Sequence, residues 1–521
     1  MAVLVEERDV NHSERRRRWW RAMSEEGEEA GGACIFVCEG LLLLSISTHF
    51  YLIKPQGCGK IDFICNSHST LEQAMFYISI YLIAVGNGAY EPCLVTFGAD
   101  QFDEEDEDER KSKASFFKYF YVALNLGSMF SETVLAYFQN LGKWEMGFWL
   151  SSGCALFSFV MLLTGSSRYR YFKPNGNPLS RFSQVIVASV RKMNYQVPLH
   201  GEGLHELQTP VNSRNGRRIL HTDDFKWLDR AAIIPHEEIA SQSMESTNTH
   251  TPNPWYLCTV SQVEEVKCII RLVPVWLCTV IFSMIFIQML SLFVEQGAAM
   301  NTLISSSFHI PPASMTVFDI ICISCFIILY DRFLVPLYTK ITGSKPVVLS
   351  ELQRIGIGLI VAVVAIFSAG LVELQRLKYS SHGANNETSS LSIFWQIPQY
   401  ILLGVAEAFA YVGELEFFAA QTPDGLKSLG IGLSMASTAI GSYLSSLLLT
   451  VVMEVTSKHG HSAGWVPPNL NDGHLHRFFF LSAGITSLNL VAFVVCAKRF
   501  KCISFEKRES DDNEPVEEVM A

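Results

Sequence analysis

The sequence predicts an all-α protein that crosses a lipid bilayer about ten times. Hydrophobic residues make up 49% of the 521 residues, whereas charged residues make up only 17%. The apolar residues gather in runs of roughly 20, the length that one helical crossing needs. Lysine and arginine concentrate in alternate loops between these runs, as the positive-inside rule expects. We therefore expect an integral, multi-pass membrane protein.

The spans follow from the apolar runs in chain order. The chain opens with charged residues and shows no cleavable signal peptide, so the first span is expected to serve as the targeting signal. We place the spans at residues 32–51, 74–94, 116–138, 147–164, 268–293, 318–338, 355–373, 393–418, 429–453 and 478–497.

Positive charge marks one side of the membrane as cytosolic. Basic residues stand before the first span, after the second and after the last, whereas the loops 140–146 and 297–313 hold one lysine between them. Both termini are therefore predicted to be cytosolic. The net charge of −11 does not contradict this, because acidic residues gather in 100–109 and in the C-terminal tail. We interpret both acidic stretches as solvated surface.

A long soluble loop divides the chain into a four-span and a six-span part. The loop starts basic, has a Ser/Thr/Asn-rich middle at 241–253, and ends at 263–271 as an amphipathic helix that leads into the fifth span. The predicted domains are 1–30 (cytosolic N-terminal segment), 31–164 (N-terminal helical bundle), 165–266 (cytosolic central loop), 267–500 (C-terminal six-helix bundle) and 501–521 (acidic cytosolic tail).

Two loops predicted to lie outside the cytosol carry modification signals. Cys58 and Cys65 share the first such loop, where they form either a disulfide or two free thiols. Asn386 begins an Asn-x-Thr triplet and is a predicted glycosylation site. The similar triplet at Asn11 is predicted to be cytosolic and to stay unmodified.

Two acidic residues inside apolar runs give the strongest functional indication. Glu407 lies in the middle of 393–418, a stretch without lysine or arginine, and Glu91 lies near the far end of 74–94. An ionisable side chain in hydrocarbon is costly and is a functional-site hypothesis by default. The two acids indicate a transporter that holds a proton or a cation within the membrane.

The two acids lie at similar predicted depths. Both helices descend from the outer side, which places Glu91 roughly 25 Å and Glu407 roughly 21 Å down their spans at 1.5 Å per residue. If they meet across a cavity, they cannot both ionise cheaply, and the pair favours a proton or a monovalent cation over an anion. The alternatives are a structural Glu407, hydrogen-bonded to helix ends, and a solvated Glu91 near the cytosolic boundary.

Further polar and aromatic residues are candidates for lining a substrate pathway. At helical spacing, Asn87 shares a face with Glu91, and Tyr411 and Glu414 share a face with Glu407. Aromatic residues on helix faces also serve as packing, which is the alternative interpretation. The remaining candidates of this kind are Tyr77, Tyr81, Tyr121 and Asn125.

Four motifs resemble those of one membrane protein family. They read FGADQFDE at 97–104, LDRAAI at 228–233, QVEEVK at 262–267 and WQIPQY at 395–400. From residue 32 to 501 the chain resembles the proton-dependent oligopeptide transporter family, and within it the plant branch of low-affinity nitrate and peptide transporters. The run LIKPQGCG at 52–59 is similar to the subfamily that moves nitrate and potassium from root to shoot.

The resemblance implies the major facilitator fold, in which two six-helix bundles rock around a midplane site. The first apolar run, 32–51, resembles the third helix of the family. The first two transmembrane helices, and the Glu-x-x-Glu-Arg proton motif on the first of them, are therefore expected to be missing. The chain is then either a truncated form or a protein that works without a complete front bundle.

Two positions depart from the family pattern. Glu91 replaces a lysine that commonly pairs with the glutamate matching Glu407, so an ion pair becomes two facing acids. Phe286, two residues before Gln288, takes the position of the histidine that binds nitrate in the best-known nitrate carrier. We include Phe286 and Gln288 among the pathway candidates. The substrate stays open among nitrate, potassium and other small solutes such as peptides.

The leading functional prediction is a proton-coupled secondary transporter with Glu407 and Glu91 as coupling residues. The alternative is a truncated, non-transporting isoform that associates with full-length family members and modulates them. The sequence shows no HExxH motif and no Walker loop, so we predict no enzyme. We expect no cofactor, no metal and no nucleic acid partner. We place the protein in the lipid bilayer, at the plasma membrane rather than the vacuolar membrane.

Overall fold

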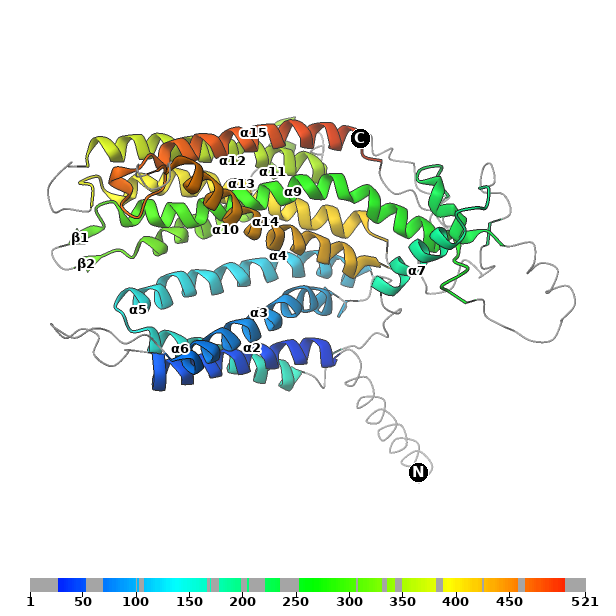
Figure 1. Cartoon of the computed structure of the whole chain (residues 1–521), viewed down its shortest axis with the longest axis horizontal. Coiled ribbons are helices and arrows are strands. Elements are labelled where there is room, and N and C mark those ends of the chain that lie inside the picture. The colour runs from blue at the N-terminus through cyan, green and yellow to red at the C-terminus, as the bar shows by residue number, and fades with distance from the viewer. Residues whose placement is uncertain are drawn as a thin grey trace, which may run out of the picture. The chain divides into compact units, whose positions relative to one another are not determined.

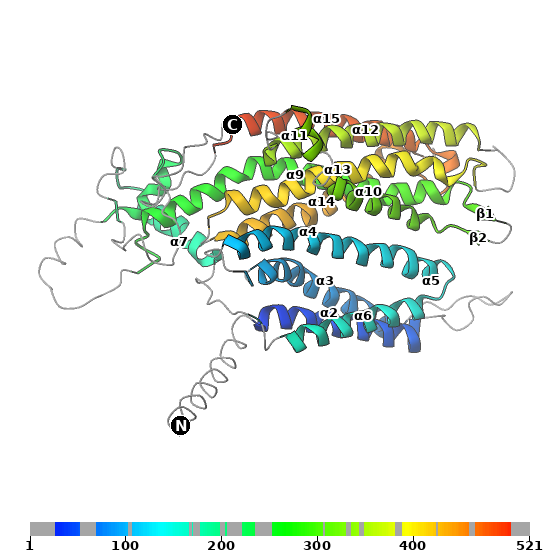
Figure 2. The ribbon, with the colours of Figure 1, turned by 180° about the vertical axis from the view of Figure 1, so that it is seen from behind.

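The protein is almost entirely helical, as Figures 1 and 2 show. The exception among the described residues is a short antiparallel pair, β1 (Leu303–Ser305) and β2 (Phe308–His309), in which Leu303 pairs with His309. The predicted all-α class is therefore confirmed. The computed structural model describes residues 27–52, 69–99, 101–102, 107–165, 169, 178–197, 204–205, 221–234, 253–305, 308–329, 335–342, 349–380, 388–423, 426–457 and 464–501.

The chain divides into two compact units. The first comprises Met1–Pro174 and Thr302–Ser324, and the second comprises Asn175–Asn301 and Cys325–Ala521. The break at residue 174 lies within the predicted central loop. The other boundary falls inside α10 (Val317–Leu329), so this helix contributes to both units.

The first unit contains the helices of the four-span part. Its helices and turns are α2 (Gly27–Ser47), η1 (Thr48–Leu52), α3 (Thr70–Ala99), α4 (Glu107–Phe130), η2 (Ser131–Leu135), α5 (Ala136–Asn140), α6 (Trp144–Gly165) and η5 (Pro312–Thr316). Helix α2 packs against α3 and α6. A Cβ atom at Gly40 would lie 2.9 Å from the backbone nitrogen of Ile83, so α2 and α3 approach closely only because residue 40 is glycine.

Hydroxyl contacts connect the elements of the first unit. Ser45 of α2 and Ser152 of α6 lie 2.7 Å apart through their Oγ atoms, and both are buried. Ser314 of η5 donates to the backbone oxygen of Glu132 at 3.0 Å. These contacts place η5 against η2, although 182 residues separate them in sequence.

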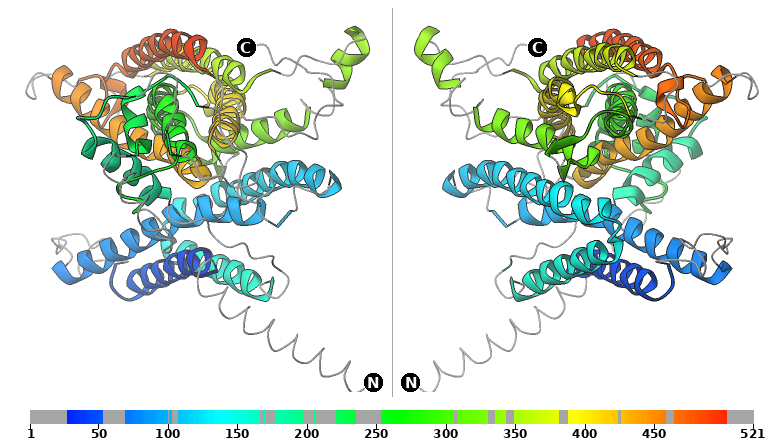
Figure 3. Two further views of the ribbon diagram at one scale, coloured as in Figure 1. Left: turned by 90° about the vertical axis from the view of Figure 1, so that its right-hand side faces the viewer. Right: turned by 90° about the vertical axis from the view of Figure 1, so that its left-hand side faces the viewer.

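The second unit is a bundle of long helices, which the end-on views of Figure 3 show in cross-section. Helix α12 packs against α13 and α15, and α9 packs against α14 and α15. The elements of this unit, besides part of α10, are α7 (Pro178–Arg191), η4 (Lys226–Ala232), α9 (Val260–Ala298), α11 (Val335–Thr342), α12 (Glu351–Lys378), η7 (Ile393–Gln396), α13 (Ile397–Gln421), α14 (Lys427–Thr456), η10 (Leu470–Asp472) and α15 (Leu475–Arg499).

Local sequence signals define where the helices of the second unit begin. Thr259 caps α9 by accepting a hydrogen bond from the backbone N–H of Gln262. Ser350 and Gln353 form a capping box at the start of α12. Pro398 stands in the first turn of α13, where its missing N–H leaves no partner unsatisfied.

The core of the second unit lies between α9, α12, α13 and α15. Leu272, Leu359, Phe417 and Phe493 are each at most 1% exposed and belong to one apolar cluster. Small residues bring α12 and α13 together, because a Cβ atom at Gly358 would lie 2.7 Å from the backbone nitrogen of Ala410. The candidate site is built on this tightly packed pair.

Five of the described helical segments are long and apolar enough to cross a membrane, namely α6, α9, α12, residues 429–456 of α14, and α15. They contain the spans predicted at 147–164, 268–293, 355–373, 429–453 and 478–497. Helix α9 has 39 residues, or about 58 Å at 1.5 Å per residue, which exceeds the ~30 Å of hydrocarbon in a bilayer. We therefore expect its first turns to lie outside the membrane, in line with the amphipathic pattern at 263–271.

Candidate functional site

The predicted coupling acids lie on helices of different units. Glu407 is ten residues into α13 in the second unit and is partly buried. Glu91 lies on α3 in the first unit, and its side chain is outside the described part of the structure. The predicted meeting of the two carboxylates therefore remains a prediction.

Two turns after Glu407, a second acid of α13 is almost fully buried. Glu414 is 2% exposed, and its Oε1 lies 2.8 Å from Ser437 Oγ and 3.4 Å from Ser434 Oγ. Both serines come from α14. Tyr411, on the same face of α13, is partly buried. Glu414 is thus held by hydroxyl groups at the contact between α13 and α14.

The surroundings of Glu414 are otherwise apolar and closely packed. Helix α9 contributes Thr279 and Phe282, α12 contributes Leu359, and α15 contributes Phe493. The pocket they form has no room for a water molecule. In this conformation Glu414 therefore lies inside the bundle rather than along an open channel.

Helix α9 carries the other two candidates from the second unit. Gln288 is buried and accepts a hydrogen bond from Ser445 of α14. Phe286 packs against Phe282, with ring centroids 5.9 Å apart. One face of α9 is thus bound to α14 through polar groups, and Trp276 adds a hydrogen bond to the carbonyl oxygen of Leu433 at 2.7 Å.

The candidates of the first unit differ in exposure. Tyr77 and Tyr81 are 58% and 69% exposed, and Asn87 is also exposed. Asn125 of α4 is buried. Tyr121 lies on α4, but its side chain is outside the described residues.

Three further predicted positions lie outside the described residues. These are the candidate disulfide residues Cys58 and Cys65 and the candidate glycosylation site Asn386. Their predicted roles remain predictions.

With this geometry in place, comparison with known proteins identifies the family. The sequence profile of the POT family matches residues 32–466. The chain belongs to the POT family. The resemblance first seen in the motifs of the loops is therefore confirmed, and the chain is a transporter-family protein rather than an enzyme.

The plant relatives of this POT-family chain are similar over nearly its whole length. Protein NRT1/PTR FAMILY 7.3 of Arabidopsis thaliana is 52% identical over 496 residues, which cover 93% of this chain and 79% of the relative. Protein NRT1/PTR FAMILY 7.2 from the same plant is 49% identical, over 92% of this chain and 81% of the relative. The chain therefore lies within the nitrate and peptide transporter branch of the POT family.

Solved POT-family structures share the fold. The crystal structure of an auto-inhibited POT family peptide transporter aligns with a TM-score of 0.61 at 18% identity, covering 96% of this chain and 86% of that one. The POT family transporter PepTSo aligns with a TM-score of 0.58, also at 18% identity, covering 90% and 83%. These structural similarities confirm the helical transporter fold that the sequence predicts.

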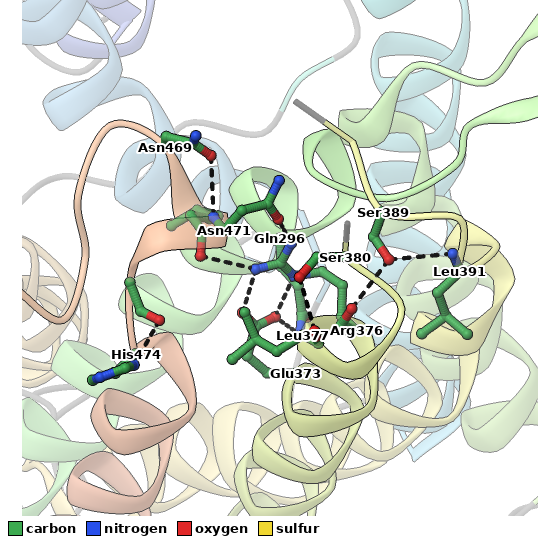
Figure 4. Close-up of polar contacts among 12 residues, drawn as sticks. Gln296, Glu373, Arg376, Leu377, Ser380, Ser389, Leu391, Asn469, Asn471 and His474 are labelled. Carbon is green, nitrogen blue, oxygen red and sulfur yellow. Dashed lines mark hydrogen bonds and ion pairs between the residues drawn. The ribbon is translucent and has the colours of Figure 1, made fainter. Parts of the chain in front are cut away.

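A buried ion pair that the sequence did not suggest joins several elements of the second unit (Figure 4). Arg376 of α12 is fully buried and lies 2.7 Å from Glu373 Oε1 through its Nη2. The same guanidinium donates to Asn471 Oδ1 at 2.6 Å and to the carbonyl oxygen of Leu470 at 3.1 Å. These contacts of Arg376 hold η10 against α12.

The ion pair continues into a chain of amides. Gln296 of α9 donates to Glu373 at 2.8 Å, and its own oxygen accepts from Gln396 and Gln399, each at 3.0 Å. All four side chains are fully buried. Sequence reasoning had placed Glu373 only near a span end, and the i,i+3 pairing with Arg376 is the signal that could have revealed this network.

A second unexpected cluster lies at the start of α9. Lys267 is fully buried, and its Nζ lies 2.7 Å from Asp229 and 2.8 Å from Glu264. It also donates to the carbonyl oxygen of Thr222 at 2.8 Å. These contacts hold η4 and the residues before it against α9, so the LDRAAI and QVEEVK motifs meet here.

The same cluster has the spacing of a metal site but already contains a cation. His221, Asp229 and Glu264 offer ligand atoms within 4.8 Å of one another. The ammonium of Lys267 contacts both carboxylates and so supplies the balancing positive charge. We therefore interpret this cluster as a structural connection.

Cys258, next to this region, is unsuited to act as a nucleophile. It is 1% exposed, and burial raises the pKa of its thiol to about 11, an effect that nearby Lys192 only partly opposes. The thiol donates to the carbonyl oxygen of Pro254 at 3.4 Å. At neutral pH the group is a neutral thiol, because its pKa lies well above that pH.

Proposed function

We propose that this POT-family protein is a proton-coupled secondary transporter of a small solute, with nitrate, potassium and short peptides as candidate substrates. The observation that carries the proposal is the pair of acids on one face of α13, Glu407 partly buried and Glu414 buried. Carboxyl groups inside a bundle of apolar helices can take up and release protons without any cofactor. The NRT1/PTR names of the plant relatives and the peptide transporter among the solved relatives support nitrate and peptides as candidates, whereas potassium rests on the sequence resemblance alone.

In this proposal Glu407 is the coupling residue. It lies in mid-helix, in a stretch without lysine or arginine, so its charge depends on the proton it holds. Glu91 takes the position of the lysine that is usual in the family, and two acids that face each other would share a proton or a monovalent cation. We retain Tyr81, Asn87 and Gln288 as proposed pathway residues.

The test compares accumulation with exchange in proteoliposomes. We expect Glu407→Gln to abolish uptake driven by a pH gradient but to preserve exchange of labelled for unlabelled substrate, because glutamine mimics the neutral acid and cannot release a proton. Nitrate, rubidium as a potassium analogue, and a dipeptide are the three substrates to test.

The matched control is Glu416→Gln, which makes the same chemical change two residues from the buried acid. Glu416 is exposed and binds Arg354, so this variant is expected to transport like the wild type. Gradient-driven uptake by Glu407→Gln equal to that of the wild type would show that the coupling site lies elsewhere.

A second candidate function is a form that does not transport and modulates longer relatives by associating with them. The observation that favours it is the low burial of α6, a helix of the first unit. In the most apolar stretch of α6 only 11% of residues are buried, against 56% in α9 and 50% in α12. Helix surfaces of this kind are available to pack on further helices.

We further propose about ten spans, cytosolic termini and residence in the plasma membrane rather than the vacuolar membrane. The basic residues on alternate loops support the orientation. A pH-sensitive fluorescent protein fused to the C-terminus tests both points. Its position in the cell shows which membrane holds the protein, and its response to a change of external pH shows on which side the C-terminus lies.

A further inference from the structure

The carboxyl group of Glu414 has three hydroxyl neighbours and no charged partner among its contacts in the described residues. Ser437 and Ser434 of α14 lie 2.8 Å and 3.4 Å from its Oε1, and Thr279 of α9 contributes the third hydroxyl. The rest of the pocket is apolar, apart from the thiol of Cys278. An ionised carboxylate in such a place requires strong hydrogen-bond donors.

Ser437 cannot be such a donor without losing another hydrogen bond. Its Oγ also lies 2.6 Å from the backbone carbonyl oxygen of Ser434, one turn earlier in α14. A serine hydroxyl has one hydrogen and two acceptor lone pairs. A carbonyl oxygen has no hydrogen to give, so the hydroxyl hydrogen belongs to this shorter contact. Ser437 then presents a lone pair to Glu414.

The hydroxyl of Thr279 has likewise used its one hydrogen in another contact. Its Oγ1 donates to the carbonyl oxygen of Trp276 at 2.9 Å, which uses its only hydrogen. Ser434 remains as a donor, but 3.4 Å is beyond the usual range of an O–H···O hydrogen bond. The hydroxyls around Glu414 are therefore arranged mainly as acceptors. A hydrogen on the carboxyl group itself completes the contact with Ser437.

We propose that Glu414 is a proton-binding site of the second unit, protonated in this conformation and donating its O–H to Ser437 Oγ. The ligand is a proton rather than a metal cation, since the pocket has no room even for a water molecule. When the proton leaves, the carboxylate faces two oxygen lone pairs. Proton binding at Glu414 thus stabilises the packing of α13 against α14 and α9.

The other ionisable groups near this site leave the argument unchanged. Cys278 of α9 faces Glu414 and has Cys496 of α15 beside it, and both are thiols. From α12, the guanidinium of Arg354 points to Glu416 and to the carbonyl oxygen of Leu349. Among the described residues of α14, the groups that contact Glu414 are the two serines. On α13 itself, Glu407 lies two turns away.

Infrared difference spectroscopy tests this site without requiring transport. The full chain in lipid nanodiscs is titrated with acid and base, in H₂O and in D₂O. We expect the carbonyl stretch of a protonated carboxylic acid to persist at neutral pH, where exposed carboxylates are ionised. Glu414→Gln should remove this band, and Glu416→Gln should leave it unchanged.

Ser437→Ala provides a second, independent reading. Loss of the acceptor should move the Glu414 band to higher frequency, because the acid loses its hydrogen bond. Identical acid bands in the wild type and Glu414→Gln would overturn the proposal, and so would an unshifted band in Ser437→Ala if the first variant fails to fold. Glu407→Gln should retain the Glu414 band, so the result is independent of the coupling role proposed for Glu407.

Discussion

Buried acids of the second unit are neutralised in two different ways. Glu373 is paired with the guanidinium of Arg376 and accepts a hydrogen bond from the amide of Gln296, so a cation lies beside its carboxyl group. Among the described residues, the hydrogen-bonding partners of Glu414 are hydroxyl groups, most of which present lone pairs to it. The first arrangement suits a permanent structural connection, because breaking a buried ion pair is costly. The second suits a group that changes its protonation state.

Removal of Arg376 is therefore expected to destabilise the protein strongly. Arg376→Met leaves Glu373 buried without its cation, which typically costs about 3–5 kcal/mol. We expect a clear fall in the midpoint of thermal unfolding of the purified protein in detergent. The double variant Glu373→Gln with Arg376→Met should recover part of the loss, because no unpaired charge then remains.

Arg354→Met is the matched control for this experiment. Arg354 binds Glu416, but the two side chains are 23% and 48% exposed, so the pair should contribute about 1 kcal/mol or less. Equal losses in Arg354→Met and Arg376→Met would contradict the structural role of the buried pair.

The residues of these networks were only partly predictable from the sequence. Glu407 stands out because no basic residue lies in its apolar run. Glu414 was found through its spacing from Glu407, but its serine partners on α14 follow only from the packing of the helices. Arg376 depends on Asn471, which lies 95 residues further along the chain, so no local pattern could indicate their contact.

At the scale of elements, glycine determines how closely α12 and α13 pack. A Cβ atom at Gly358 would lie 2.7 Å from the backbone nitrogen of Ala410 and 2.9 Å from the carbonyl oxygen of Ala406. Because these are backbone atoms, the two helices would have to move apart. This contact supports the helix that carries Glu407 and Glu414.

Gly358→Ala is accordingly expected to lower stability by about 1–3 kcal/mol, the usual range for overpacking. Gly484→Ala on α15 is the control, because no atom lies within 4 Å of its added Cβ. That variant should be neutral or more stable by up to about 1 kcal/mol, since alanine favours the helix. Thermal unfolding of both proteins checks the difference, and similar behaviour would contradict the close contact.

The five described helical segments that are long and apolar enough to cross a membrane were predictable, because such a helix needs a long apolar run and these runs are visible in the sequence. The extension of α9 was also indicated by the amphipathic pattern at 263–271. The pairing of β1 with β2 was not predicted, since strands of three and two residues leave no periodic signal. The burial of Lys267 was missed because its partner Asp229 lies on a separate element, η4.

At the scale of the whole molecule, the apolar stretches of the described helices differ in burial, and those of α14 and α15 in the second unit are 22% and 39% buried. The apolar stretches of α9 and α12 are about half buried, at 56% and 50%, whereas that of α6 is 11% buried. Transport by major facilitators depends on two bundles that move against each other around a central site.

We therefore predict that this chain, expressed alone, shows little pH-driven uptake compared with a version carrying two additional N-terminal spans from a plant relative. The reason is physical: the apolar stretch of α6 is only 11% buried, and helix surfaces suited to protein contacts pack poorly against lipid. Uptake into proteoliposomes is measured for both proteins at equal amounts of inserted protein. Thermal unfolding is recorded in parallel and should show the longer version to be more stable. Equal uptake and equal stability would contradict this prediction and would remove the support for the non-transporting alternative.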